Sequence, residues 1–169
     1  MDQKKVACIV VTFNRKDLLI KCLDAIKSQH YKPHSVFIID NASTDGTRQL
    51  VEKNGYDSCI INGIHFEYVL LSENIGGSGG FYTGFKKAFE SEENFDAFWV
   101  MDDDGIADEN QLKELLPYLD KYHYVSPNVR SIENPAIGAF FTPPANQKVD
   151  NAGNYLGVAN PFNGVLYSR

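Results

Sequence analysis

Three consecutive carboxylates, Asp102, Asp103 and Asp104, follow the apolar residues 98–101 and precede Gly105. An apolar run rich in aromatic and β-branched residues is typical of a buried strand, whereas three adjacent acids cannot be buried without partners. Like charges held this close disfavour each other's ionisation, and a divalent cation would relieve that repulsion. Carboxylate oxygens are the ligands that Mg²⁺ and Mn²⁺ prefer. The sequence therefore predicts a metal site at the end of a strand, with a solvated acidic turn as the alternative.

Alternation along an extended chain predicts which acids would share the metal. Residues i and i+2 of such a chain point to the same side. Asp102 and Asp104 are therefore the predicted ligands of Mn²⁺ or Mg²⁺. Asp103 would point elsewhere, towards a sugar hydroxyl.

The composition indicates one globular domain that does not bind nucleic acid. The chain has 169 residues, 43% of them hydrophobic, and a formal net charge of -6. This length can bury a core, and the negative charge disfavours a nucleic-acid backbone but not a nucleotide bridged by a metal. No apolar run approaches the roughly 20 residues of a membrane span, and the first residues lack a signal-peptide pattern. We expect a cytoplasmic protein, and any peripheral association with the inner face of the membrane would involve a part beyond residues 1–169.

Strand patterns and helix patterns alternate along most of the chain. This alternation predicts an α/β fold with a mostly parallel sheet covered by helices on both faces. The predicted strands are residues 6–12, 36–40, 65–71, 95–101, 124–125 and 162–167, with a further strand or hairpin at 137–142. The predicted helices are residues 18–29, a helix capped by Ser43 or Thr44 that ends near Gly55, residues 81–89, and a helix capped by Asp108 that carries Leu112, Leu115, Leu116 and Leu119 inward.

In such a sheet the ligand lies outside the carboxyl ends of the strands, so four segments should share one rim. These segments are residues 12–15, 40–44, 74–80 and 102–105. Asp40 could accept a hydrogen bond from a base or form a turn or cap, and Arg15 could hold a phosphate or remain a surface residue. The glycines of 76–80 would let the backbone approach an anionic ligand, although Tyr82 and Phe85 break the Rossmann and Walker patterns. Together the segments indicate a nucleoside-diphosphate site.

The segments VACIVVTFNR, IIDNASTDGT, NIGGSGGF and WVMDDDG, in this order, resemble the inverting glycosyltransferases of family 2, which have the GT-A fold. NIGGSGGF followed by a triple aspartate is similar above all to the galactofuranosyl- and rhamnosyltransferase branch. The resemblance extends over about residues 6–169. It implies a donor-binding domain for a UDP- or dTDP-linked sugar, and transfer to a glycan or lipid-linked acceptor in polysaccharide biosynthesis of the cell envelope.

The resemblance also implies roles for particular residues. The donor-binding positions are Thr12, Phe13, Arg15, Asp40, Asn41, Asn74, Gly76, Gly77, Asp102 and Asp103. Asn163 and Gly164 match a segment beside the acceptor. In this family the general base lies downstream of a segment like NGVLYSR, so we expect it after Arg169 and expect no catalytic residue within this chain. The chain then resembles an amino-terminal portion, incomplete at its C-terminus: one domain over 1–169, with a nucleotide-binding part over about 1–122 and the start of an acceptor-side part over about 123–169.

Two other functions are compatible with these patterns. A sugar nucleotidyltransferase also places an acid-tipped strand near a glycine-rich loop. Such an enzyme needs a basic glycine loop after its first strand, where residues 13–15 are Phe-Asn-Arg. A nucleotide-binding or interaction module without metal chemistry would leave the acids as solvated turns.

Overall fold

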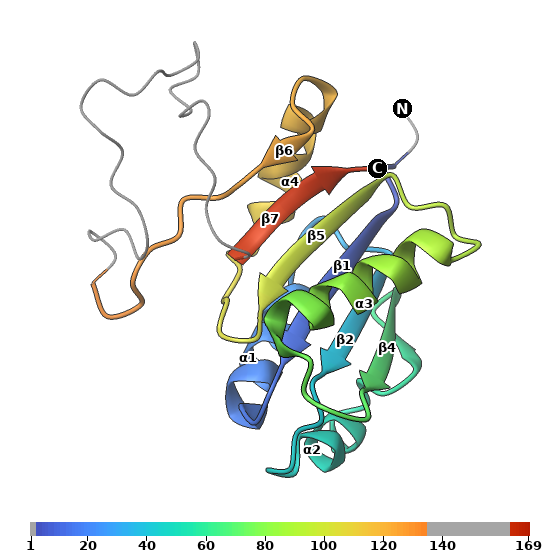
Figure 1. The fold of residues 1–169 in the computed structure, drawn as a ribbon. Helices are drawn as coiled ribbons and strands as arrows, with labels where there is room; N and C mark the ends of the chain where they lie inside the picture. Colours follow the sequence, from blue (N-terminus) through green and yellow to red (C-terminus); the bar gives the residue numbers. More distant parts are fainter. Residues whose placement is uncertain (1–2, 135–162) are drawn as a thin grey trace.

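The computed structural model describes residues 3–134 and 163–169, which form one mixed sheet with helices on both faces (Figure 1). The strand order is β3-β4-β2-β1-β5-β7-β6. The four central strands are parallel to one another: β4 (Ile64–Leu70), β2 (Ser35–Asp40), β1 (Val6–Thr12) and β5 (Ala97–Asp102). The bordering strands pair antiparallel: β3 (Cys59–Ile61) with β4, β7 (Asn163–Ser168) with β5, and β6 (Tyr124–Val125) with β7. The predicted α/β class and mostly parallel sheet are confirmed.

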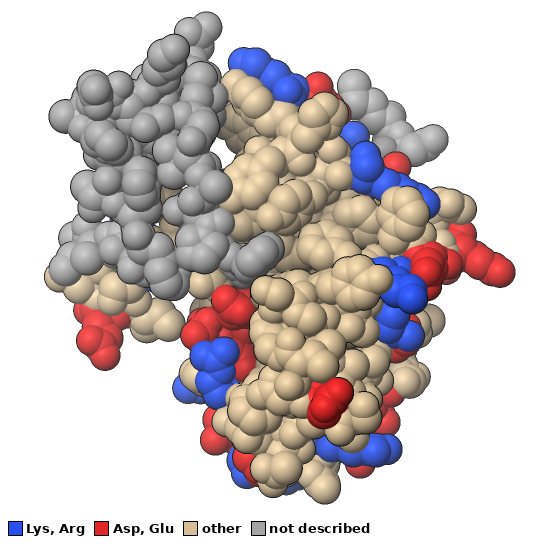
Figure 2. All heavy atoms as spheres, in the orientation of Figure 1, with Lys and Arg blue, Asp and Glu red and all other residues tan. Residues whose placement is uncertain are grey.

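The helices divide between the two faces of the sheet. On one face lie α1 (Lys16–Lys27), α2 (Thr47–Lys53), α4 (Gln111–Leu115) and the 3-10 helix η1 (Leu116–Asp120). The other face is covered by α3 (Gly76–Glu90), which crosses β1 and β2 (Figure 1). The outer surface on the α3 side carries few charges in its centre (Figure 2), and Tyr82 is 67% exposed there.

The first strand shows why both faces can be buried. All seven residues of β1 are buried. Cys8 and Val10 pack in the core beneath α1, whereas Ile9 and Val11 pack beneath α3. Because successive side chains of a strand point to opposite faces, an uninterrupted apolar run is what a strand covered on both sides requires.

The glycine-rich segment is helical rather than a loop. Helix α3 begins at Gly76, five residues before the predicted start at Phe81. A Cβ atom on Gly80 would lie 2.7 Å from Val11 Cγ1, and one on Gly84 would overlap Ile9. Glycine is a weak helix former, but here its missing side chain lets α3 approach the sheet closely, so packing outweighs propensity.

Two predicted helix caps differ from the structure. Helix α2 begins after Gly46, whose φ of 90° favours glycine, and the Asp45 carboxylate accepts the Thr47 N–H at 3.1 Å. Ser43 and Thr44 are not its caps. Helix α4 begins after Asn110, and Asp108 lies in the preceding turn, where its carboxylate accepts the Asn110 N–H at 3.0 Å. Both corrections have one cause: short polar side chains can bond nearby N–H groups in turns as readily as at helix starts.

The remaining differences concern strands and the bounds of two helices: α1 lies two residues earlier than predicted, and the helix predicted after Asp108 divides into α4 and η1. The sequence analysis did not predict the short strand β3, whereas the last strand lies close to its predicted position. The predicted hairpin at 137–142 falls outside the described residues. In residues 3–134 and 163–169, no helix is both long enough and apolar enough to cross a membrane.

Candidate functional site at the carboxyl ends of the parallel strands

The carboxyl ends of the parallel strands bring the predicted segments to one rim. Thr12 at the end of β1 is the register partner of Asp40 at the end of β2, and Val11 is the partner of Asp102. The Asn41 N–H then donates to Thr12 O at 2.9 Å. The sheet register therefore places the segments that follow β1, β2 and β5 side by side.

Within the triple aspartate, the middle residue faces inward. Thr12 Oγ1 donates to Asp103 Oδ2 at 2.6 Å, and Arg15 Nη2 lies 2.7 Å from Asp103 Oδ1. The Asp103 side chain is fully buried, whereas that of Asp104 is 46% exposed. Asp103 thus faces Thr12 and Arg15, where we had expected it to point towards a sugar hydroxyl. A carboxylate can be buried here because a hydroxyl and a guanidinium compensate it.

Arg15 bridges two of the acids. Its Nη1 donates to Asp104 Oδ2 at 3.0 Å while its Nη2 pairs with Asp103. The contact with Asp103 Oδ1 has the distance of an ion pair, yet no hydrogen bond of good geometry reaches that oxygen within the described residues. Arg15 therefore holds Asp104 through a hydrogen bond and an ion pair, and Asp103 through its charge.

The negative charge of the site is only partly compensated. Burial, with the neighbouring charges of Asp104 and Asp103, raises the pKa of Asp102 to about 6, against the opposing effect of Arg15. Burial also raises the pKa of Asp103, and the Thr12 hydrogen bond and the Arg15 charge oppose that rise. Such crowding of carboxylates is the electrostatic condition that a bound cation would relieve.

Asp40 has the turn role that the sequence analysis weighed as an alternative. It is fully buried, and its Oδ1 accepts the Ser43 N–H at 2.7 Å. Its Oδ2 accepts the hydroxyl of Tyr68. Burial and this hydrogen bond raise the pKa of Tyr68 far above its ordinary value. Asp40 therefore orders the loop after β2, and Tyr68 is a partner that no sequence motif indicated.

Asn41 joins the end of β2 to the start of α3. It is 2% exposed, and its Nδ2 donates to Gly76 O at 3.2 Å. Its Oδ1 is buried and has no hydrogen-bond partner in the described part of the chain. Nearby, the Asn74 carboxamide accepts the Gly76 N–H at 2.8 Å, and a Cβ atom on Gly77 would meet nothing within 4 Å. The rim thus has an unused buried acceptor and open space beside the helix start.

The other predicted positions lie at the edges of this site. Phe13 follows β1 and is 41% exposed. Asn163 is the register partner of Met101 on β5, and a Cβ atom on Gly105 would lie 3.3 Å from Asn163 Oδ1. The carbonyl of Gly164 accepts the indole N–H of Trp99 at 3.0 Å. The acceptor-side pair therefore borders the acidic turn, with Gly164 also serving the packing of β5.

Gln29 positions the loop that follows the acids. This residue is fully buried, and its Nε2 donates to Asp108 O at 2.5 Å. Its Oε1 accepts the Leu112 N–H at 3.1 Å. Gln29 could not be predicted from the sequence, because a lone polar residue at a helix end has no pattern that reveals its partners.

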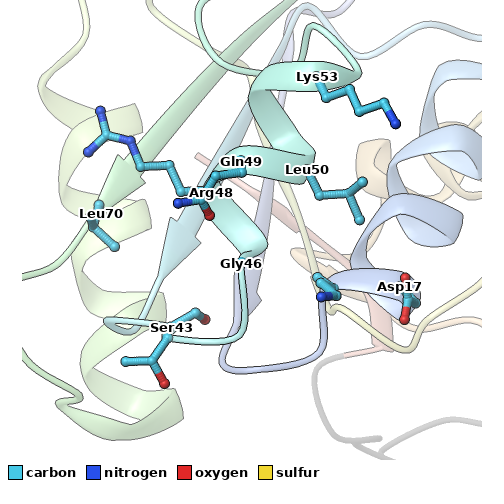
Figure 3. Close-up of a pocket in the computed structure, with 10 residues that line it drawn as sticks. Asp17, Ser43, Gly46, Arg48, Gln49, Leu50, Lys53 and Leu70 are labelled. Atoms are coloured by element: carbon cyan, nitrogen blue, oxygen red, sulfur yellow. The ribbon is translucent and has the colours of Figure 1, made fainter.

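A cavity of about 660 Å³ lies beside α2, and its lining does not include the three consecutive acids (Figure 3). Its basic lining residues are Lys16, Arg48 and Lys53. Lys16 Nζ donates to Asp45 O at 2.8 Å, and Arg48 pairs with Glu52 at 2.8 Å. Two of these cations are therefore already partnered, and we assign the candidate site by the chemistry of the rim and not by this hollow.

The described residues contain no group of three or more His, Cys, Asp and Glu side chains arranged to hold a metal. Asp102 and Asp104 provide two carboxylates. Two are sufficient for Mg²⁺ sites of the kind that are completed by water and substrate phosphates.

Comparison with known proteins gives similarity in sequence and in fold. The profile of glycosyl transferase family 2 matches residues 7–139. Galactofuranosyltransferase GlfT1 of Mycolicibacterium smegmatis is 31% identical over 183 residues, which cover 99% of this chain and 57% of the relative. The chain thus spans little more than half the length of that relative.

Two solved structures share the GT-A fold. TarS of S. aureus, residues 1–349, has a TM-score of 0.69 and 19% identity over 97% of this chain and 47% of that one. Mannosyltransferase PcManGT of Pyrobaculum calidifontis, in complex with GDP-Man and Mn²⁺, has a TM-score of 0.62 and 22% identity over 80% of this chain and 38% of that one. These comparisons confirm the GT-A fold and the resemblance to the galactofuranosyltransferase branch. This chain belongs to glycosyl transferase family 2.

Proposed function

We propose that this chain binds the nucleoside-diphosphate sugar donor of an inverting glycosyltransferase, together with a divalent metal. The observation that carries the proposal is the arrangement of the three acids. Asp103 is buried and contacts Thr12 and Arg15. The half-buried Asp102 and the exposed Asp104 therefore remain at the rim, and their negative charge is only partly compensated.

Asp102 and Asp104 are the residues that would hold the metal, Mn²⁺ or Mg²⁺. Their oxygens suit a hard cation, and burial together with the neighbouring acids raises the pKa of Asp102, an effect that a bound cation would oppose. The complex of PcManGT with GDP-Man and Mn²⁺ supports a divalent metal in this fold. When bound, such a cation offsets the charge of the diphosphate and stabilises it as a leaving group.

The buried oxygen of Asn41 is the acceptor that we assign to the nucleotide base. Leaving a buried acceptor unpaired costs free energy, and an N–H group of the base would satisfy it once the Asn41 carboxamide turns towards the rim. Phe13 directly follows β1, the neighbour of β2, and is exposed, so it can contact the ring, and the open space at Gly77 admits the ligand next to the start of α3. A UDP- or dTDP-linked sugar has the required N–H, and TarS has also been solved with UDP-GlcNAc.

The complete reaction is part of the proposal. An acceptor hydroxyl, on a glycan or a lipid-linked sugar, loses its proton to a carboxylate that acts as general base. We assign this base to no residue of this chain, which matches 57% of the length of GlfT1. The hydroxyl oxygen attacks the anomeric carbon as the bond from that carbon to the diphosphate oxygen breaks, which inverts the configuration. Asn163 and Gly164 border the side from which the acceptor would enter. We place the protein in the cytoplasm, at most peripherally at the inner face of the membrane.

Calorimetric titration with UDP, with and without Mn²⁺, tests this function. We expect wild-type protein to bind UDP in a Mn²⁺-dependent manner, and the double variant Asp102→Asn, Asp104→Asn to lose that dependence. A matched control is Asp57→Asn with Asp120→Asn, which removes the same charge from two exposed acids outside the rim. We call the double variant Asp102→Asn, Asp104→Asn the rim variant. The proposal would be refuted if the rim variant still bound UDP in a Mn²⁺-dependent manner, or if the wild-type protein bound neither UDP nor dTDP.

A further inference from the structure

The two ion pairs of Arg15 differ in how firmly they are held. Its partner Asp103 is fully buried and also accepts a hydrogen bond from the Thr12 hydroxyl. Breaking the Arg15–Asp103 ion pair would therefore leave a buried charge without its counter-charge. Its partner Asp104 is 46% exposed and the Arg15 side chain 44%, and ion pairs this exposed to water contribute little stability. Asp103 is therefore a fixed anchor for the guanidinium, and Asp104 is an exchangeable partner.

The exchangeable partner is also one of the two acids that we assign to the metal. From this we propose that Arg15 is the counter-ion of the empty donor site: it neutralises Asp104 until a divalent cation binds, and then turns the released Nη1 edge to the donor diphosphate. This inference rests on the proposed function and adds to it a coupling between metal and donor.

The geometry lets Arg15 do both without leaving the site. Among the described residues, Nη1 contacts Asp104 and Nη2 contacts Asp103. Release of Asp104 thus frees one edge of the planar guanidinium while the other edge stays anchored. A guanidinium edge matches the oxygens of a phosphate group.

The arrangement predicts opposite effects of Arg15 on two ligands. Arg15 weakens the binding of a cation alone, because its charge lies beside Asp104 and competes for it. It strengthens the binding of nucleotide once the cation is present. Metal and nucleotide therefore favour each other, and because linkage is reciprocal each raises the affinity of the other by the same factor.

The test is a titration of the chain with Mn²⁺, with and without saturating UDP. Electron paramagnetic resonance measures the concentration of free Mn²⁺ at each step of the titration. The variants are Arg15→Gln and Arg15→Lys. The control Arg48→Gln removes an equal charge from an exposed pair with Glu52 on α2. Thermal unfolding of each protein shows that it is folded, and Arg15→Lys serves if Arg15→Gln does not fold, since a lysine can still pair with Asp103.

We expect Arg15→Gln to bind Mn²⁺ alone roughly three- to tenfold more tightly than wild type, the effect of one charge about 4 Å away in a wet site. The factor by which UDP raises the affinity for Mn²⁺ should decrease correspondingly. Arg15→Lys should lie between, because one ammonium cannot bridge both acids, and Arg48→Gln should match wild type.

Folded Arg15 variants that bind Mn²⁺ alone no more tightly than wild type, or an unchanged effect of UDP, would overturn the inference. If wild type binds UDP in a Mn²⁺-dependent manner and the variant Asp102→Asn, Asp104→Asn loses that dependence, such a result removes the role of Arg15 and leaves the proposed function standing. If wild type binds neither ligand, the proposed function fails and the inference fails with it.

Discussion

Thr12 at the end of β1 donates a 2.6 Å hydrogen bond to the carboxylate of Asp103, 91 residues later in the chain. Both side chains are buried. This contact joins the central strand to the acidic turn and turns the middle acid inward. It thereby determines which two carboxylates remain at the rim.

Replacing Thr12 with Val should destabilise the fold. The change keeps the shape of the side chain but removes the donor to a buried carboxylate, at an expected cost of about 1–3 kcal/mol. Denaturant unfolding measures it. Thr83→Val is the control, because the Thr83 hydroxyl donates at 2.9 Å to a backbone carbonyl within α3 and does not serve a buried charge. Equal losses in the two variants would show that the Asp103 contact has no special weight.

Alanine variants of two glycines at the start of α3 should distinguish residues needed for packing from residues needed for binding. Gly80→Ala places a Cβ atom 2.7 Å from Val11 Cγ1 and should cost about 1–3 kcal/mol of stability. Gly77→Ala meets nothing within 4 Å, so it should leave stability unchanged or raise it by about 0.5–1 kcal/mol.

In binding measurements the order should reverse. Gly77→Ala should weaken UDP binding, since its methyl group would enter the space that we assign to the donor. Thermal unfolding and calorimetric titration of both variants provide the comparison. A Gly77→Ala protein that binds UDP as wild type does would remove Gly77 from the donor site.

Tyr68→Phe should destabilise the rim by removing the hydroxyl that Asp40 accepts. Asp40 is fully buried, so one of its oxygens would lose its partner, at a cost of about 1–3 kcal/mol. Tyr82→Phe is a matched control on a side chain that is 67% exposed. If denaturant unfolding gives the same free energy for both variants, the Tyr68–Asp40 bond contributes nothing to the fold.

Metal affinity should fall as the pH falls through about 6, the value to which burial and the neighbouring acids raise the pKa of Asp102. Protonated Asp102 cannot bind a cation, so Mn²⁺ binding at pH 5 should be weaker than at pH 7. Asp102→Asn should abolish most of this dependence. Mn²⁺ titrations at the two pH values measure it, and a wild-type affinity independent of pH would contradict the assignment of Asp102 as a ligand.

The same raised pKa affects the stability of the fold in the opposite direction: metal affinity rises with pH, whereas this contribution to the free energy of unfolding falls with pH. The ordinary pKa of this carboxyl is 3.8, so between about 3.8 and 6 the folded protein binds more protons at Asp102 than the unfolded chain does. This contribution to stability is therefore fully present below about 3.8 and is lost as the pH rises towards 6. Comparison of wild type with Asp102→Asn by denaturant unfolding across that window isolates it, and parallel curves would refute it.

The sequence was sufficient to predict the rim, because its evidence is local. Continuous apolar runs such as that of β1 indicate strands buried on both faces, and parallel strands must end together. The convergence of Thr12, Asp40 and Asp102 follows from those two facts and the register confirms it. The family resemblance rested on the same segments.

The structure was needed wherever a partner is distant in sequence. The inward turn of Asp103 depends on Thr12 and Arg15, and the burial of Asp40 depends on Tyr68 on a neighbouring strand. Helix α3 begins at Gly76 because Gly80 and Gly84 pack on the sheet, a reason that helix propensity does not contain. In each case tertiary contacts select among conformations that the local sequence permits.

The binding of UDP to the chain of residues 1–169, titrated with and without Mn²⁺, tests the central claim most directly. Our account predicts binding that Mn²⁺ strengthens in wild type and in the Asp57→Asn, Asp120→Asn control, and no strengthening in Asp102→Asn, Asp104→Asn. Equal Mn²⁺ dependence in the control and in the rim variant would contradict it.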